Sequence, residues 1–299
     1  MNRFESIFAK SSTVLPSRLL RRALRAVARP IDSIYSARIV ANFGSSSRDH
    51  IFLLGVPRAG TSLLSTILSC HRSLSFAGDE TQIFLLNNFI YKKLPNLSEI
   101  KMRELLRAAK SRVEFFDLLA DHYLELQVGT ERFLEKTPEH AFHLERLYNV
   151  YPNAQFIFSA REPRDAYASI CRSRNLPDPS LDGYAASWNS LTSNYFLFPK
   201  KRVHLVRYED LVRDPDSIVS EVCSFINVDY EQTMLDPEMH AKMSGSYRLH
   251  DYHARIGEPI SPKSIGSWKK TLCQDDADQL FEATKESARK LGYVNSMQL

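Results

Sequence analysis

The sequence predicts an α/β fold in which helices cover both faces of a central parallel sheet. Three observations lead to this prediction. Short apolar runs typical of buried strands alternate along the chain with stretches of helical periodicity. A glycine-containing loop joins the first apolar run, residues 51–54, directly to the first helical pattern. With 299 residues and 43% hydrophobic content, the chain is long enough to bury such a sheet in one large domain.

The apolar runs predict four strands, at residues 51–54, 132–135, 154–159 and 202–207. Helical patterns follow the glycine loop and recur at residues 81–92, 98–127, 138–151, 164–174 and 183–197. Turn chemistry at residues 94–96 separates the first two of these ranges, which we interpret as a helical cap. Because parallel sheets bind ligands at the carboxyl ends of their strands, we expect the site residues just after the strands.

The first 48 residues differ in charge from the rest of the chain. They hold nine Lys/Arg and two acids, whereas the whole chain has a formal net charge of +4. Between residues 18 and 29, leucines and arginines recur at helical spacing and predict a short basic amphipathic helix. Such a helix packs its leucines on the domain, or it contacts an anionic membrane surface or an acidic partner. We therefore divide the chain into a basic N-terminal helical arm, residues 1–48, and a domain, residues 49–299.

Cysteine usage, hydropathy and charge argue against several classes of protein. The four cysteines are scattered without a C-x-x-C pair, so we expect neither a zinc site nor a disulfide framework, and a reducing compartment fits. No run of 18 apolar residues and no signal-like segment occurs, so we predict a cytoplasmic protein whose only membrane contact is peripheral. The chain beyond the arm is acidic on balance, so nucleic acid is not an expected partner. The sequence does not define the oligomeric state.

The glycine loop runs from Gly55 to Ser62 and matches the phosphate-binding pattern G-x-x-x-x-G-K-[ST] except at the lysine, where Thr61 stands. A helix N-terminus that follows such a loop presents unpaired N–H groups and the positive end of its dipole, which favour an anion. The pattern therefore predicts a P-loop three-layer sandwich that binds a nucleotide phosphate. An ordinary strand-to-helix turn is the alternative reading of the loop alone.

The missing lysine and the presence of Arg58 argue against ordinary ATP hydrolysis. No convincing acidic partner for magnesium stands beyond the hydroxyls of the loop. Transfer of a sulfuryl group fits better, because this group carries less negative charge than a phosphoryl group and Arg and Lys can neutralise the leaving phosphate without a metal. His140 and His143 lie three residues apart beside Glu139, but no third ligand with suitable spacing supports a metal site.

Six motifs resemble those of sulfotransferases that use 3'-phosphoadenosine-5'-phosphosulfate (PAPS). The loop resembles the P-R-[SA]-G-T-[ST]-L form found in protein-tyrosine sulfotransferases and many bacterial relatives. The resemblance spans about residues 50–292 in the order of the family, through Gly55–Leu64, Gly78–Thr81, Glu135–Pro138, Arg161–Ser169, Arg207–Leu211 and Ile265–Lys269. It implies PAPS as the co-substrate and no metal.

The resemblance also implies which residues bind the nucleotide. The loop that holds the 5'-phosphosulfate comprises Pro57, Arg58, Ala59, Gly60, Thr61, Ser62 and Leu63. Arg161 and Ser169 match the pair that binds the 3'-phosphate, with Arg172 or Arg174 as a further arginine. Tyr208 matches a position near the adenine. Lys263 and Lys269 lie in a late segment that closes over the nucleotide, although Glu258 stands near the place where the tyrosine-sulfating branch carries a lysine.

Three residues are predicted to act in catalysis. Glu80 matches the glutamate that takes the proton from the acceptor hydroxyl, with the adjacent Asp79 as its rival. Arg58 and Lys136 are placed around the sulfuryl group, where they stabilise charge on the departing phosphate. An ion pair with Glu135 or Glu139 is the alternative role of Lys136.

The resemblance does not name the acceptor, since one fold carries many functions. A carbohydrate, a lipid headgroup, a small molecule such as a phenol, and a peptide tyrosine all remain open. Two other functions remain as alternatives to the sulfotransferase: a P-loop small-molecule kinase that uses ATP and magnesium, and a non-catalytic scaffold that binds nucleotide.

Overall fold

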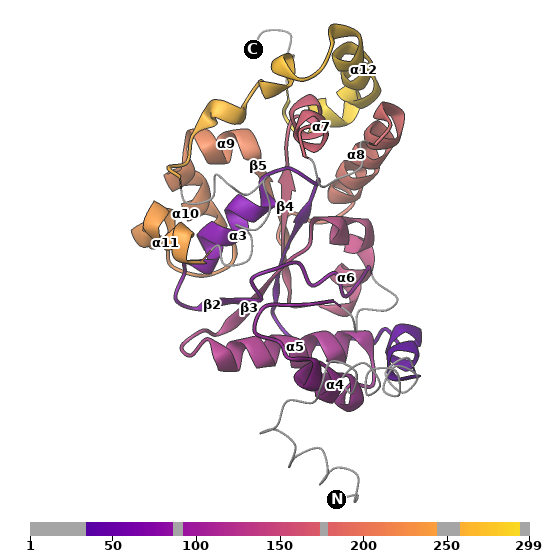
Figure 1. The fold of residues 1–299 in the computed structure, drawn as a ribbon, viewed down its shortest axis with the longest axis vertical. Helices are drawn as coiled ribbons and strands as arrows, with labels where there is room; N and C mark the ends of the chain where they lie inside the picture. Colours follow the sequence, from indigo (N-terminus) through magenta and orange to yellow (C-terminus); the bar gives the residue numbers. More distant parts are fainter. Residues whose placement is uncertain (1–33, 86–91, 174–178, 244–257, 294–299) are drawn as a thin grey trace, which may run out of the picture.

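The computed structural model describes residues 34–85, 92–173, 179–243 and 258–293 (Figure 1). The predicted basic helix at residues 18–29 lies outside these ranges, so its contact with a membrane or a partner stays a prediction, as does the cytoplasmic location. Among the described residues, no helix combines the length and the hydropathy that a membrane span requires.

Five parallel strands form one sheet, in the order β2-β3-β1-β4-β5. They are β1 (Ile51–Gly55), β2 (Leu74–Phe76), β3 (Arg132–Lys136), β4 (Gln155–Ala160) and β5 (Val203–Arg207). This arrangement confirms the predicted α/β class with a central parallel sheet. Four strands stand where the apolar runs predict them. The fifth, β2, was not predicted, because three residues are too few to show a strand pattern.

The register of the sheet brings the site segments to one edge. Gly55 at the end of β1 is paired with Ser159 of β4, and Ala160 is paired with Arg207 of β5. On the other side of β1, Leu53 is paired with Lys136 at the end of β3. The loops that follow these strands therefore emerge side by side at the carboxyl ends, as expected for a ligand site in a parallel sheet.

Alternate strand residues enter two separate cores, which makes the three layers of the fold. Ile51, Leu53 and Ile157 pack with apolar residues of α3 (Thr61–Ser69) and α10 (Pro215–Phe225) on one face. Phe52 and Phe158 pack on the other face. Helices on that second face include α5 (Arg112–Leu126), α6 (Leu144–Val150), α8 (Leu181–Phe196) and α12 (Gln274–Lys290). Strands buried on both faces read as continuous apolar runs, which is why β1 and β4 were predictable.

The remaining helices connect these layers. They are the 3-10 helix η2 (Pro138–His143), α7 (Pro163–Cys171), α9 (Tyr208–Arg213), η3 (Gln232–Leu235), α11 (Pro237–Met243), η6 (Pro262–Ser264) and η7 (Ser267–Lys270). The predicted helix at 138–151 begins at Pro138 as expected, but its first six residues are the 3-10 helix η2 and only α6 is α-helical.

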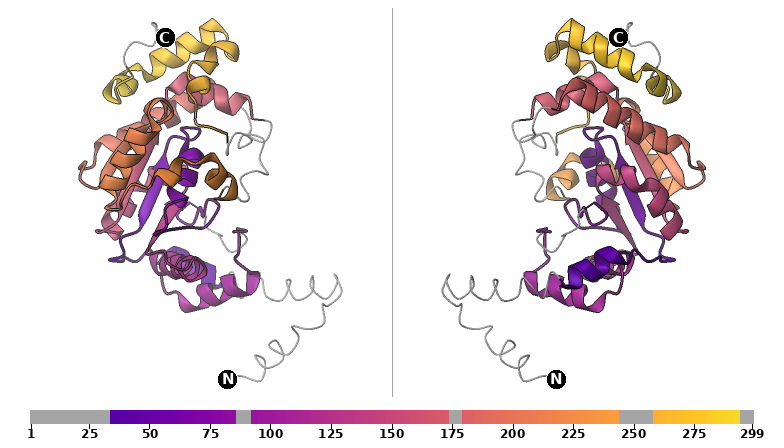
Figure 2. Two further views of the ribbon diagram at one scale, coloured as in Figure 1. Left: turned by 90° about the vertical axis from the view of Figure 1, so that its left-hand side faces the viewer. Right: turned by 90° about the vertical axis from the view of Figure 1, so that its right-hand side faces the viewer.

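The predicted helical cap differs in detail from the structure. Residues 81–85 are not helical, so the prediction of a helix there was wrong, and residues 86–91 lie outside the described ranges. The predicted helix at 98–127 is divided into α4 (Glu99–Ala108) and α5, because the Ser111 hydroxyl accepts the N–H of Glu114 and starts a new helix. Figure 2 shows α4 and α5 at the opposite end of the molecule from α12.

These two helices lie at the amino end of the sheet, away from the glycine loop. His50, which precedes β1, has its Nε2 atom 2.9 Å from Oδ1 of Asp117 on α5. Residues 34–41 form a helix that packs here too, with Ile39 in the core and the Arg38 guanidinium donating to the carbonyl of Ala109. Residues 34–41, within the predicted arm, are therefore anchored on the domain.

Candidate active site

A cavity of about 310 Å³ opens at the carboxyl ends of the strands, beside the glycine loop and the start of α3. Residues from segments far apart in the chain line it: Pro57, Arg58, Gly60, Thr61, Ser62, Leu63, Glu80, Pro138, Glu139, Arg161, Ser169, Arg172, Tyr208, Val212, Glu258, Pro259, Ile260, Ser261 and Ser264. Eleven of the predicted site residues are among them, including Arg172; its alternative, Arg174, lies outside the described residues.

Two glycines let the backbone of the glycine loop lie very close to neighbouring segments. A Cβ atom on Gly55 would lie 2.1 Å from the carbonyl oxygen of Ser159, so only glycine allows β1 to pass β4 this closely. Gly60 has φ +79°, and a Cβ atom there would lie 2.6 Å from the ring of Tyr208. Arg58 also takes a left-handed conformation, with φ +69°, which is strained for a residue other than glycine.

The N-terminus of α3 is open toward the cavity. Gly60 is its N-cap residue, no side chain caps it, and its first turn contains no acidic residue. The first N–H groups of a helix have no partner within the helix, and the dipole adds positive potential at this end. Thr61, Ser62 and Leu63 carry these N–H groups and all three line the cavity. This end of the cavity can therefore hold an anion through backbone donors.

Three guanidinium groups surround the same end of the cavity. Arg58 Nε donates to Ser169 Oγ at 3.2 Å. Arg172 donates to Thr271 Oγ1 at 2.7 Å and to Ser267 Oγ at 3.2 Å. Burial, and then the charge of Arg161, lower the pKa of Arg172 from its ordinary value. Positive charge is thus concentrated here, and an anion would relieve the repulsion.

Arg161 is 5% exposed and is held in place by several groups. Its guanidinium lies over the ring of Tyr208 at 4.2 Å and donates to the carbonyl of Ser264 at 2.7 Å. The Nε atom of Arg161 is buried and has no hydrogen-bond partner among the described residues. An unpaired buried donor is costly, so this side chain fits a site that receives an anion.

The segment that carries Ser264 is fixed by α7. The Asp165 carboxylate accepts the N–H groups of Gly266 at 2.7 Å and Trp268 at 2.9 Å. The Arg164 guanidinium stacks on the Trp268 ring at 4.2 Å. These contacts hold the segment that brings Ser261 and Ser264 to the cavity wall. Lys263 and Lys269 are exposed and are not among the lining residues.

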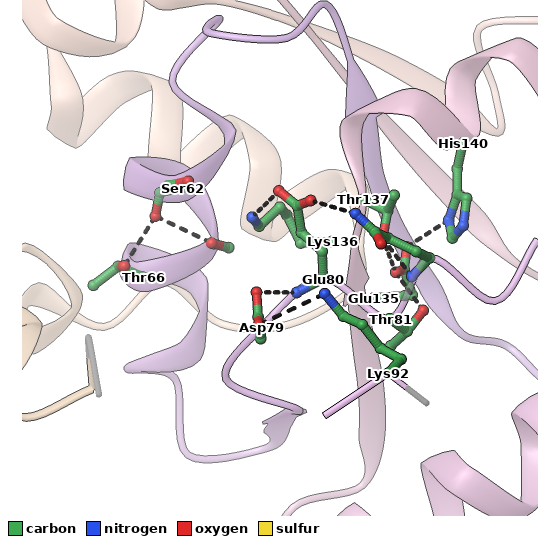
Figure 3. Close-up of polar contacts among 12 residues, drawn as sticks. Ser62, Thr66, Asp79, Glu80, Thr81, Lys92, Glu135, Lys136, Thr137 and His140 are labelled. Carbon is green, nitrogen blue, oxygen red and sulfur yellow. Dashed lines mark hydrogen bonds and ion pairs between the residues drawn. The ribbon is translucent and has the colours of Figure 1, made fainter. Parts of the chain in front are cut away.

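On the other side of the cavity, Lys136 and Glu80 form an ion pair (Figure 3). Lys136 Nζ donates to Glu80 Oε1 at 2.7 Å; the lysine side chain is 1% exposed and the glutamate side chain 26%. Lys136 ends β3 and lies behind Glu80, which itself lines the cavity. The pair thus presents a carboxylate to the cavity and an ammonium group directly behind it.

Asp79, the rival of Glu80, points elsewhere. Its Oδ1 atom accepts the N–H of Glu80 at 2.7 Å and its Oδ2 atom is 3.8 Å from Lys92 Nζ (Figure 3). Asp79 is not among the residues that line the cavity. The arrangement favours Glu80 as the group that meets a ligand. Ala59 is likewise absent from the lining, because it is buried and its carbonyl accepts the hydroxyl of Ser159.

Glu139 lines the cavity and was considered in the sequence only as a partner of Lys136 or of a metal. Burial, and then the charge of Glu80, raise the pKa of Glu139 above its ordinary value. Its Oε2 atom is buried without a hydrogen-bond partner among the described residues. Its place in the first turn after Pro138 was the available signal, since that turn follows a strand end. Within the described ranges, no three His, Cys, Asp or Glu residues are grouped to hold a metal ion.

The model of the sulfotransferase family matches residues 50–232. This match confirms the resemblance drawn from the motifs. Among curated proteins, protein-tyrosine sulfotransferase A of Caenorhabditis elegans is 23% identical over 283 residues, which cover 88% of this chain and 72% of that protein.

Two solved structures share the fold. The sulfotransferase domain from the curacin biosynthetic pathway has a TM-score of 0.62 and 23% identity, over 83% of this chain and 99% of that one. The sulfotransferase domain of the Synechococcus PCC 7002 olefin synthase has a TM-score of 0.59 and 21% identity, over 81% of this chain and 95% of that one. Both similarities agree with the parallel sheet and flanking helices described above.

Proposed function

Because the chain belongs to the sulfotransferase family, we propose that it transfers a sulfuryl group from PAPS to the hydroxyl of an acceptor. One observation carries the choice of donor. The uncapped N-terminus of α3 and the unpaired Nε atom of Arg161 belong to one cavity, and both call for an anion. A nucleotide with phosphate groups at its 5' and 3' positions has the two anionic centres that these features require.

Different residues of the cavity fit different groups of such a nucleotide. The N–H groups of Thr61 and Ser62 would hold the 5'-phosphate at the helix N-terminus. Arg161 and Ser169 would hold the 3'-phosphate, with Arg172 adding charge from the C-cap position of α7. Tyr208 offers an aromatic face beside Gly60. When bound, PAPS supplies a sulfuryl group activated by its bond to the 5'-phosphate.

Glu80 and Lys136 have different roles in the transfer step. The Glu80 carboxylate accepts the proton of the acceptor hydroxyl as the new bond from oxygen to sulfur forms. The bond from sulfur to the 5'-phosphate oxygen breaks, and the electron pair stays on that phosphate. The ammonium group of Lys136 and the guanidinium of Arg58 stabilise the negative charge that develops there. Glu80 is paired with Lys136, so a positive charge lies directly behind the proton acceptor in this wall of the cavity.

The first test is a calorimetric titration of 3'-phosphoadenosine-5'-phosphate, and separately of ATP with magnesium, into the wild type and Arg161→Ala. We expect metal-independent binding of the bisphosphate that weakens by about thirtyfold or more in Arg161→Ala, since the charged partner of a buried anion is removed. Arg103→Ala, at a partly buried arginine of α4 that does not line the cavity, is the control and should bind like the wild type. An acceptor panel with PAPS, read by mass spectrometry, then tests transfer.

Two outcomes would contradict the proposal. Preference for ATP with magnesium, together with indifference to Arg161→Ala, would favour the small-molecule kinase. Tight binding of the bisphosphate without transfer to any carbohydrate, lipid, phenol or tyrosine peptide in the panel would favour the non-catalytic scaffold.

A further inference from the structure

The carboxylate of Glu135 lies directly behind the Glu80–Lys136 pair and has no accessible surface. It accepts hydrogen bonds from three side chains (Figure 3). Thr81 Oγ1 donates to its Oε1 atom at 2.8 Å and Thr137 Oγ1 donates to the same atom at 2.6 Å. The Nδ1 atom of His140 is 2.9 Å from its Oε2 atom. A buried carboxylate is tolerated only when its oxygens are satisfied in this way.

Two of these donors are the immediate neighbours of the proposed catalytic residues. Thr81 follows Glu80, and Thr137 follows Lys136. A single carboxylate therefore binds both chain segments at the positions next to the ion pair. The segments are far apart in sequence, and no strand pairing connects residues 80–85 to the sheet.

The remaining contacts of the Glu80 loop come from the same group of residues. Thr137 Oγ1 accepts the N–H of Gln82 at 3.2 Å, and His140 Nε2 accepts the N–H of Phe84 at 3.4 Å. Gln82 has φ +53°, a strained conformation that persists only where surrounding contacts enforce it. Since Nε2 of His140 accepts here, Nδ1 carries the proton and donates to Glu135. The loop is thus held by side chains of β3 and η2.

Glu135 is ionised, which strengthens the hydrogen bonds that hold these two segments. Burial by itself raises the pKa of the carboxyl group, but the interaction with His140 and the hydrogen bonds of the threonines outweigh it, so that the pKa lies below its ordinary value. The carboxylate is therefore ionised near neutral pH. Hydrogen bonds to an ionised acceptor are shorter and stronger than neutral ones, which makes the network rigid.

We propose that Glu135 is a positioning residue, which sets the distance between Glu80 and Lys136 by fixing Thr81 and Thr137. This inference rests on the proposed function of that pair. Glu135 itself is not among the residues that line the cavity. Its effect on the reaction comes through the placement of the proton acceptor, where a displacement of about 1 Å can cost a hundredfold in rate.

The test uses Thr81→Val, which removes one donor without changing the shape of the side chain much. Glu135→Gln would change the network more directly, but it can prevent folding. Thr81→Val is therefore the variant that tests the positioning role. We expect kcat to fall by about ten- to a hundredfold while the KM for PAPS stays within about twofold, because the donor site is not touched. Thr81→Ser keeps the hydroxyl and should restore kcat. Thr192→Val is the matched control, because Thr192 is equally buried and its hydroxyl donates to the carbonyls of Trp188 and Asn189 in its own helix α8.

A second measurement does not depend on turnover. In a crystal structure of Thr81→Val, the distance between Lys136 Nζ and Glu80 Oε1 should exceed the 2.7 Å seen here, by about 1 Å. An unchanged distance, or a kcat equal to that of Thr192→Val, would overturn the positioning role. Absence of sulfuryl transfer in the wild type would instead overturn the proposed function, and the distance would still decide the role of Glu135.

Discussion

The glycine loop and the Glu80 loop lie on opposite sides of one cavity, and different kinds of interaction hold them. The glycine loop follows the central strand β1 and is shaped by its own backbone, with left-handed residues at Arg58 and Gly60. The Glu80 loop follows the short strand β2 and is shaped by side chains of β3 and η2 that converge on Glu135. The glycine loop offers backbone N–H groups to an anion, whereas the Glu80 loop presents a single carboxylate to the cavity.

The two loops should therefore contribute separately to nucleotide binding and to turnover. Backbone donors at a helix N-terminus act on phosphate in the ground state and should determine the affinity for the nucleotide. A carboxylate that accepts a proton acts in the transition state and should determine kcat. Substitutions on the two sides of the cavity should therefore change different quantities, and three experiments test this expectation.

The largest effect is expected for Glu80→Gln. An amide has nearly the shape of the carboxylate but cannot accept the proton, so kcat should fall by about 10²- to 10⁴-fold. The dissociation constant for 3'-phosphoadenosine-5'-phosphate should stay as in the wild type, because Glu80 does not touch the anion-binding end of the cavity. Steady-state kinetics with PAPS and calorimetry with the bisphosphate measure the two quantities.

Asp79→Asn is the control for the same loop. Its carboxylate faces Lys92 and the N–H of Glu80 rather than the cavity. Its effect on kcat should be much smaller than that of Glu80→Gln. If Asp79→Asn abolished turnover while Glu80→Gln retained it, the two acidic residues would exchange roles and the assignment of the proton acceptor would be wrong.

Gly60→Ala should act on the opposite side. The new Cβ atom would require a left-handed alanine and would meet the Tyr208 ring at 2.6 Å. Such strain costs about 1–3 kcal/mol, so the affinity for the bisphosphate should fall by about ten- to a hundredfold if the loop relaxes out of its binding conformation. The kcat at saturating PAPS should change less than the affinity, and calorimetry with steady-state kinetics separates the two.

Gly129→Ala isolates the conformational part of that effect. Gly129 has φ +94° and lies in a turn that does not line the cavity. Apart from its chain neighbours, no atom of the described residues lies within 4 Å of the place of its Cβ. It should reduce stability without changing the dissociation constant for the bisphosphate. Equal loss of affinity in both variants would show that the glycine loop has no special role.

The two loops also differ in how far their structure could be predicted from the sequence. The glycine loop is local: a buried strand, two glycines at fixed spacing and a helix follow one another in the chain, so its position, its anion preference and residues such as Arg58 and Thr61 were predictable. Arg161 and Ser169 were predicted from the resemblance of residues 161–169 to a sulfotransferase motif, and both residues line the cavity. These features depend on residues close together in sequence.

The Glu80 loop was not predictable in this way. Its residues 81–85 carry an apolar pattern that favours a helix, and the structure overrides it through the buried carboxylate of Glu135, 54 residues further along the chain from Thr81. The late segment shows the same limit. Its lysines 263 and 269 are exposed, and the contact with Arg161 is made instead by the carbonyl of Ser264, which carries no signature in the sequence.

The smallest effect concerns Glu139, on the same side as Glu80. Its pKa is raised in the folded state by burial and by the charge of Glu80. A raised pKa means that the folded protein holds this proton more tightly than the unfolded chain, so stability falls as the pH rises from the ordinary value of 4.5 through the raised one. Glutamine does not ionise, so the stability of Glu139→Gln does not fall with pH in this way. The variant should melt about 2 °C higher than the wild type at pH 7.

The pH dependence of this difference is the decisive part of the measurement. Thermal unfolding of both proteins from pH 4 to pH 8 should show nearly equal melting temperatures at the acidic end, where Glu139 is protonated and resembles glutamine. The gap should widen as the pH rises. In the Glu80→Gln background the gap should shrink but persist, because burial is the larger cause of the shift and the charge of Glu80 the smaller. A gap that is constant with pH would mean that Glu139 titrates normally and that the charge of Glu80 does not act on it.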